Sequence, residues 1–303
     1  MLRKQTKSSL LRIYHKWVIS ALQEEFGMAS RFSLWVEQHQ LAAYFLLTFV
    51  ITWGLVTPLV LSAQGLISIQ LSPHWHFLGA LGPISAALLV TGLAGGRPGI
   101  GEFLGRMLRW RVGAGWFFIA AFSPFVLFGL SVIICSAQSG SWPDFSRLLS
   151  REYANFGWIA GWVIPGLAYG IGEEPGWRGF ALTRLQGGRS ALPATIILWV
   201  FWALWHIPFF FYRFEFGLVQ AAGFLAAMFA GAIWLTCLYN STGGSILMVV
   251  LWHFTWNIVN IISPVISGEI NALMSAMVMV AAAIVIIGWG PARLSPGGKH
   301  TIQ

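Results

Sequence analysis

Long runs of apolar residues alternate along this chain with short polar segments. A helix needs about 20 residues to cross the hydrocarbon core of a bilayer. Eight runs meet or approach that length: Leu41–Leu61, Phe77–Leu93, Trp116–Ala137, Phe156 to near Thr183, Leu192–Phe211, Gly217–Tyr239, Ser245–Val265 and Ile270–Trp289. Backbone polar groups cannot stay unpaired in lipid, so each run should be helical. The pattern predicts an all-α, polytopic transmembrane helix bundle of about eight spans.

Composition supports this interpretation and argues against a soluble protein. Hydrophobic residues make up 57% of the chain, charged residues 9%, and the mean hydropathy is +0.71, whereas a soluble domain is about 25% charged. The net charge of +8 reflects few acids rather than a basic patch, so nucleic acid is not an expected partner. The two cysteines, Cys135 and Cys237, lie in apolar runs and form no zinc motif or disulfide framework.

Basic residues predict the orientation. With the N-terminus inside the cell, all but three of the 18 Lys and Arg residues fall in inner segments, and the exceptions are Arg147, Arg151 and Arg213. Cytoplasmic loops carry such an excess of basic residues. We therefore expect a multi-pass protein of the plasma membrane with both termini in the cytoplasm.

Four regions are expected along the chain. Residues 1–40 form a basic cytoplasmic segment rather than a secretory signal, because they lack a continuous apolar core and a nearby cleavage site. Apolar positions from Leu10 to Leu22 fit either a helix lying on the inner membrane face or a solvated tail. Spans 1–3 occupy residues 41–150, a core with polar residues follows over 151–265, and the last span and a short tail occupy 266–303. The segments Gly96–Gly101 and Pro291–Gly298 are typical of an ordinary loop and tail.

Six polar residues within the apolar runs are the candidates for chemistry. Ionisable residues inside a membrane are costly and usually functional. The six are Glu173, Glu174 and Arg178 in the fourth run, His206 in the fifth, and His253 and Asn257 in the seventh.

The fourth run places two carboxylates beside one guanidinium. Glu174 and Arg178 are four residues apart and share a helix face, so Arg178 can neutralise Glu174. Glu173 points about 100° away and is free for another task. Such a group can keep one carboxylate ionised and shift the pKa of the other. The alternative is an interfacial charge cluster that ends the helix at Pro175 and Gly176.

The two histidines extend this candidate site over three helices. His253 and Asn257 share a helix face and should point into the bundle, because lipid offers them no partner. Glu, His, His and Asn are the groups that a metal-bound or directly activated water needs. A proton relay, or hydrogen bonds that merely tie helices together, would use the same residues. Their depths agree only if the fourth helix continues past Pro175 and the fifth span starts late or tilts.

These residues resemble the CAAX protease and bacteriocin-processing family, also called CPBP or Abi, which includes the type II CAAX prenyl endopeptidases. The resemblance rests on three ordered motifs: Glu173-Glu174-x-x-x-Arg178, Trp202-x-x-x-His206 and His253-x-x-x-Asn257. The family more often has Phe where this chain has Trp202. Thr242-Gly243-Gly244-Ser245 also looks like the family's inner-loop signature. The similarity covers roughly Phe156–Val265.

The resemblance implies an intramembrane endopeptidase with a polar chamber open towards the cytosol, acting on a protein or peptide at the bilayer, with CAAX-type C-terminal processing as one form. Glu173 would be the general base. By the same resemblance, Glu174 and Arg178 would hold that base in place and adjust its pKa. His206 and His253 would polarise the water, and Asn257 would stabilise the oxyanion. Candidate zinc ligands are His206, His253 and Glu173.

Two alternatives stay open at this stage. The soluble metalloprotease motif His-Glu-x-x-His is missing from the sequence, so a metal site would have to be assembled from separate spans. A zinc site and a metal-free site are both compatible with the residues, and zinc is favoured. A non-catalytic transporter, scaffold or bacteriocin-immunity factor would use the same polar cluster, and the sequence does not say whether a substrate is prenylated.

Overall fold

The computed structural model describes residues 31–150 and 158–301, and these residues form helices and no strand. The prediction of an all-α bundle is confirmed. The amphipathic pattern from Leu10 to Leu22 lies outside the described residues.

Seven helices of the described part are long and apolar enough to cross a membrane. The helix bounds are α2 Gln40–Ala63, α3 His76–Gly79, α4 Leu81–Met107, α5 Ala114–Ser139, α6 Trp158–Glu174, α7 Thr183–Gly188, α8 Ala191–Trp205, α9 Leu218–Ser241, α10 Ile246–Ile266 and α11 Gly268–Arg293. The remaining predicted span is α6, which is only 17 residues long but continues through a π-helical segment, η4 (Pro175–Leu182), into α7. About eight spans therefore fit the structure.

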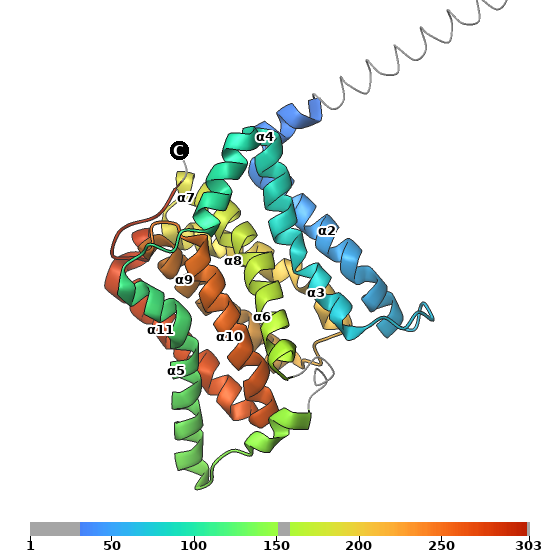
Figure 1. The fold of residues 1–303 in the computed structure, drawn as a ribbon, viewed down its shortest axis with the longest axis vertical. Coiled ribbons are helices and arrows are strands. Elements are labelled where there is room, and N and C mark those ends of the chain that lie inside the picture. Colours follow the sequence, from blue (N-terminus) through green and yellow to red (C-terminus); the bar gives the residue numbers. More distant parts are fainter. Residues whose placement is uncertain (1–30, 151–157, 302–303) are drawn as a thin grey trace, which may run out of the picture.

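The bundle has two distinct ends. Figure 1 shows α7 and the C-terminus at the top and the connection that follows α5 at the bottom. The end with α7 and the C-terminus, here called the basic end, carries Arg106, Arg109, Arg184, Arg189, Arg293 and Lys299. The opposite end carries the connections 64–72, 140–144 and 212–217 and the turn at Ser267.

The segment Gly96–Gly101 is helical, so the prediction of a loop was wrong. Helix α4 extends to Met107, with a break at Gly96 (φ 56°, ψ −153°). A positive φ is easily reached by glycine, and Pro98 then fits the first turn of a new helical segment. Sequence periodicity could not separate two helices joined by one glycine from a helix followed by a loop.

A short tail follows α11, as the prediction for Pro291–Gly298 implies, and part of it packs against the basic end. Leu294 is 0% and Ser295 1% exposed. The Gln186 and Asn240 amides hydrogen-bond each other at 2.8 and 3.0 Å. The tail joins this pair through backbone and side-chain hydrogen bonds of Arg293, Lys299 and His300. We call these five residues the tail seal.

Candidate functional site

The helix that carries the two glutamates passes Pro175 by widening into a π-helix, and Glu173 and Glu174 lie immediately before it. Proline removes a backbone donor and crowds the preceding turn, and π-helical turns accommodate such disruptions, often at functional sites. The helix also packs closely on its neighbours, because a Cβ added at Gly176 would lie 2.6 Å from Pro83. The predicted continuation past Pro175 is confirmed.

Glu174 is the centre of a buried ionic cluster. Arg178 Nη1 donates to Glu174 Oε1 at 2.8 Å, and His253 Nδ1 donates to the same oxygen at 2.6 Å. Glu174 and Arg178 are 0% exposed. The predicted pairing of Glu174 with Arg178 is confirmed, and the contact with His253 links the first motif to the third.

Glu173 has a different partner, as its direction on the helix predicts. Its Oε2 accepts a hydrogen bond from the indole Nε1 of Trp202 at 2.9 Å. The Arg178 guanidinium lies over the same indole, 4.6 Å from the ring centroid. Trp202 therefore connects the carboxylate of Glu173 to the cation that neutralises Glu174.

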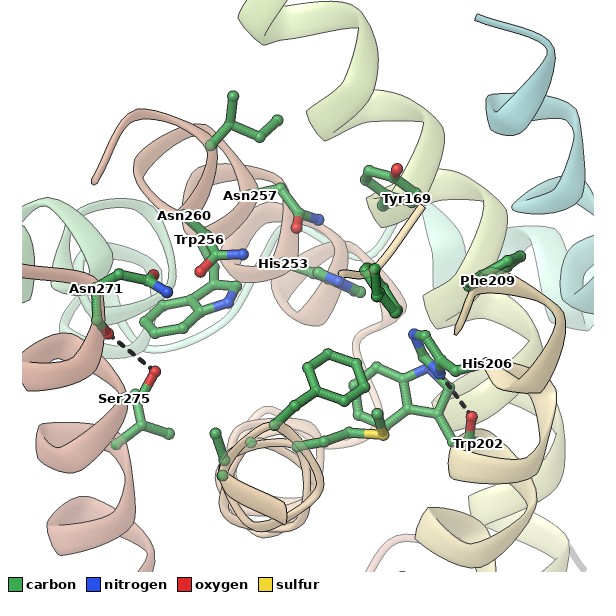
Figure 2. A pocket seen from close by; sticks show the side chains of 18 of the residues that line it. Tyr169, Trp202, His206, Phe209, His253, Trp256, Asn257, Asn260, Asn271 and Ser275 are labelled. Carbon is green, nitrogen blue, oxygen red and sulfur yellow. Dashed lines mark hydrogen bonds between the residues drawn. The ribbon is translucent and has the colours of Figure 1, made fainter. Parts of the chain in front are cut away.

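Both imidazoles are held through Nδ1. His206 Nδ1 donates to the backbone carbonyl of Trp202 at 2.7 Å, as the dashed line in Figure 2 shows, and His253 Nδ1 donates to Glu174. A neutral imidazole that donates from Nδ1 keeps a lone pair on Nε2. Both rings lie near one indole, with centroids 5.9 Å (His206) and 6.2 Å (His253) from that of Trp202.

Asn257 supplies an unused donor. Its side chain is 9% exposed, and among the described residues its Nδ2 has no hydrogen-bond partner. Leaving a buried N–H unpaired costs about 1–3 kcal/mol. Asn257 lies one helical turn beyond His253, and its amide extends beside the His253 ring (Figure 2), so a carbonyl oxygen entering there would satisfy it.

These side chains meet at one cavity of about 600 Å³. Glu173, His206, His253 and Asn257, which come from three helices, all line it. Glu174 and Arg178 lie behind the wall, where they hold His253 and Trp202. The six predicted residues are thus brought together, four at the cavity and two supporting it.

The cavity extends from this site towards the opposite end of the bundle. It is lined by α9 between Gln220 and Leu235 and by α11 between Gly268 and Met279, which are the halves of these helices nearest that end.

The predicted zinc ligands were tested against this geometry. Two Nε2 lone pairs backed by hydrogen bonds at Nδ1 are the donor chemistry that zinc uses. Within residues 31–150 and 158–301, however, no three His, Cys, Asp or Glu side chains are placed to hold a metal ion together. Zinc binding by Glu173, His206 and His253 therefore stays a prediction, and the proposed mechanism uses only the chain's own groups.

The sequence analysis did not predict that Trp202 hydrogen-bonds to Glu173. Trp202 occupies a position where the family more often has Phe, and the indole adds an N–H donor, which the structure directs at Glu173. This difference from the family pattern was the only sign in the sequence that Trp202 has a polar contact. The His253–Glu174 contact had no signal in the sequence, because it joins two helices 79 residues apart in the chain.

We expect Trp202→Phe to lower the thermal unfolding temperature while the protein still folds. The variant keeps an aromatic ring beneath Arg178 but removes the hydrogen bond to Glu173, and a hydrogen bond to a charged group is worth about 1.5–3 kcal/mol. Trp199→Phe, which removes an indole bonded to a backbone carbonyl of α9, is the matched control and should cost less, because a hydrogen bond between neutral groups is worth about 0.5–1.5 kcal/mol. Equal falls in unfolding temperature for the two variants would contradict the assigned contact.

Comparison with known proteins points to the same family as the three motifs. Residues 155–259 match the family described as Type II CAAX prenyl endopeptidase Rce1-like. A curated relative, CAAX prenyl protease 2 of Methanococcus maripaludis, is 28% identical over 121 residues, which cover 38% of this chain and 45% of the relative. The matched segment thus spans less than half of that relative. These findings support assignment to the CAAX protease family and include all six candidate residues.

Proposed function

We propose that this chain, whose 155–259 segment is assigned to the CAAX protease family, hydrolyses a peptide bond of a membrane-associated protein or peptide within the cavity described above. The observation that carries the proposal is that Glu173, His206, His253 and Asn257 line one cavity. In a proton relay, such groups would follow one another in a line across the membrane. In a scaffold, they would form hydrogen bonds between helices and would not surround a cavity.

Glu173 is the base in this mechanism. Its carboxylate takes a proton from a water in the cavity, while the water oxygen forms a bond to the carbonyl carbon of the substrate. His206 and His253 orient that water through the lone pairs on Nε2. When the C–N bond breaks, Glu173 returns the proton to the departing amine, so protons and charges balance.

Asn257 stabilises the oxyanion. Its Nδ2 is buried without a partner among the described residues, and the residue itself lines the cavity with His253. The carbonyl oxygen becomes negative as water attacks, and a donor fixed beforehand costs no reorganisation at that moment.

We expect Asn257→Ala to lower the cleavage rate by about 10²–10³, the usual value of one oxyanion donor, while substrate affinity changes little. Asn260→Ala alters another amide that lines the same cavity and should have a much smaller effect. The measurement is kcat and KM for the two variants. A fall confined to KM would show that Asn257 binds substrate rather than the transition state.

A metal requirement is a separate expectation and is tested on its own. If zinc supports the reaction, the purified protein should contain it in stoichiometric amount, and His206→Ala should lose it. Metal analysis of both proteins, together with activity after chelation, decides the matter. Full cleavage activity in a chelated, metal-free preparation would contradict the zinc prediction and leave the roles of the chain's own residues intact.

The function itself is tested with purified protein in detergent, which exposes both faces of the bundle. Two quenched fluorescent peptides serve as probes, one ending in a farnesylated Cys-a-a-X sequence and one identical but unprenylated, beside an unmodified peptide library read by mass spectrometry. Cleavage that the wild type performs and Glu173→Gln does not supports the proposal. Identical products from both proteins would overturn it.

A further inference from the structure

We propose that His76 and Arg213 form a second binding site in the cavity, which holds a carboxylate of the substrate close in sequence to the bond that is cleaved. The carboxylate is either the C-terminal group of a peptide or an acidic side chain at that position. The inference rests on the proposed function for the word substrate, but binding of the carboxylate is measured without cleavage.

His76 is a third histidine at the cavity, and it lies outside the segment that matches the family. It begins α3, is 4% exposed and lines the cavity together with His206 and His253. None of the three sequence motifs includes it. A buried polar side chain is expected to have hydrogen-bond partners, so the partners of His76 indicate which of its nitrogens is available to a ligand.

One nitrogen of His76 is held by a tyrosine. The Tyr212 hydroxyl hydrogen-bonds to His76 Nδ1. Tyr212 follows the 3-10 helix η5 (Ile207–Phe211) and does not line the cavity, so Nδ1 is the acceptor that the described residues offer its O–H. Burial raises the pKa of Tyr212, and the phenol therefore keeps the proton that it donates. An imidazole that accepts at Nδ1 carries its own proton on Nε2.

This arrangement makes His76 the chemical opposite of His206. His206 Nδ1 donates to a backbone carbonyl, which leaves a lone pair on Nε2. His76, held by a hydroxyl, instead offers the cavity an N–H donor. A lone pair suits the hydrogen of a water, whereas a donor suits an oxygen of the substrate.

Arg213 adds a positive charge beside this donor. It follows Tyr212 in the chain and lines the same cavity, and its charge acts on both His76 and Tyr212. Among the described residues that line the cavity, Arg213 is the one Lys or Arg and Glu173 the one acid. A guanidinium has five N–H donors in a plane that matches a carboxylate. The oxygen that this site selects is therefore an anionic one.

Phe209 fixes how far this site lies from the reaction. Its ring centroid is 5.4 Å from that of His206 and 4.9 Å from that of His76, and the Phe209 side chain is buried. The two imidazoles are therefore no farther apart than about three residues of an extended peptide. A substrate whose cleaved bond lies beside His206 can place at His76 only a carboxylate that is near that bond in sequence.

The test measures peptide binding to Glu173→Gln in detergent by fluorescence anisotropy, so that no probe is consumed. Three labelled forms of the unprenylated peptide of the cleavage assay are compared: the free acid, the C-terminal amide, and the amide with Asp as its last residue. Hydrogen bonds to a charged group correspond to about 10- to 100-fold in affinity. We expect at least one of the two acidic forms to bind more tightly than the plain amide by that factor, and the form that does so identifies the source of the carboxylate.

Three variants in the same background assign the preference to this site. Arg213→Gln should bring the ratio of affinities close to one, because the charge is removed. Tyr212→Phe should lower the ratio in part, since His76 loses the donor that keeps its proton on Nε2. Arg147→Gln removes an exposed arginine that does not line the cavity and should leave the ratio unchanged.

Two results would overturn the proposal. In the first, neither acidic form binds more tightly than the amide; in the second, Arg213→Gln retains the full preference. A preference in binding without cleavage by the wild type would be a failure of the proposed function alone, whereas cleavage without any preference would be a failure of this inference alone.

Discussion

Replacing Glu173 with Gln should lower peptide cleavage by about 10²–10⁴, the contribution of a positioned general base, and leave the fold intact. The amide oxygen of Gln can still accept the hydrogen bond from Trp202, so packing changes little, but the amide cannot take a proton from water. The measurement is kcat in detergent beside the thermal unfolding temperature. Loss of activity together with a large fall in that temperature would indicate a structural role instead.

Two further variants sharpen this result. Glu37→Gln neutralises an exposed acid outside the cavity and should keep full activity. The double variant Glu173→Gln/His206→Ala should be little worse than Glu173→Gln alone, because groups that act on one water are strongly non-additive. If the double variant instead lost activity by the product of the two single losses, Glu173 and His206 would act in separate steps.

Replacing Arg178 with Ala should destabilise the protein by about 3–5 kcal/mol, the usual cost of removing one partner of a buried ion pair. Glu174, which is 0% exposed, would keep only His253 as a hydrogen-bond partner among the described side chains. Trp202 would also lose the cation above its ring. The measurements are the level of protein in membranes and the unfolding temperature in detergent, and both should fall far more than in Glu173→Gln.

A double variant separates charge from packing. Glu174→Gln/Arg178→Met removes both charges together, keeps an acceptor for His253 and preserves the apolar stem of the arginine, and replacing a buried pair as a whole is often neutral. We therefore expect it to recover much of the lost stability. If Arg178→Ala and Glu173→Gln reduce the protein level equally, the two carboxylates do not have the separate roles assigned to them.

The parts of this site that could be predicted are those set by local spacing. The i,i+4 relation of Glu174 to Arg178 and the shared face of His253 and Asn257 follow from helix geometry alone. The lengths of the apolar runs predicted the spans for the same reason, since hydrocarbon thickness fixes helix length.

The parts that could not be predicted depend on how helices meet. The choice of His253 as a partner for Glu174, and of Trp202 as a partner for Glu173, is decided by how α6 and η4 rotate against α8 and α10. The break at Gly96 and the contacts of the C-terminal tail could not be predicted for a related reason. Polar, glycine-rich sequence is typical of loops, and only contacts with distant residues show that it is packed.

The tail seal also sets how much protein closes the cavity at the basic end. The cavity reaches from residues near the opposite end to Glu173, so the closed part of the bundle at this position lies between Glu173 and the hydrogen-bonded amides of Gln186 and Asn240. In a bilayer, most of the transmembrane potential falls across the part of a protein that excludes water. The residues after Gly290 therefore thicken the layer that separates the two sides of a membrane, whatever molecule the cavity binds.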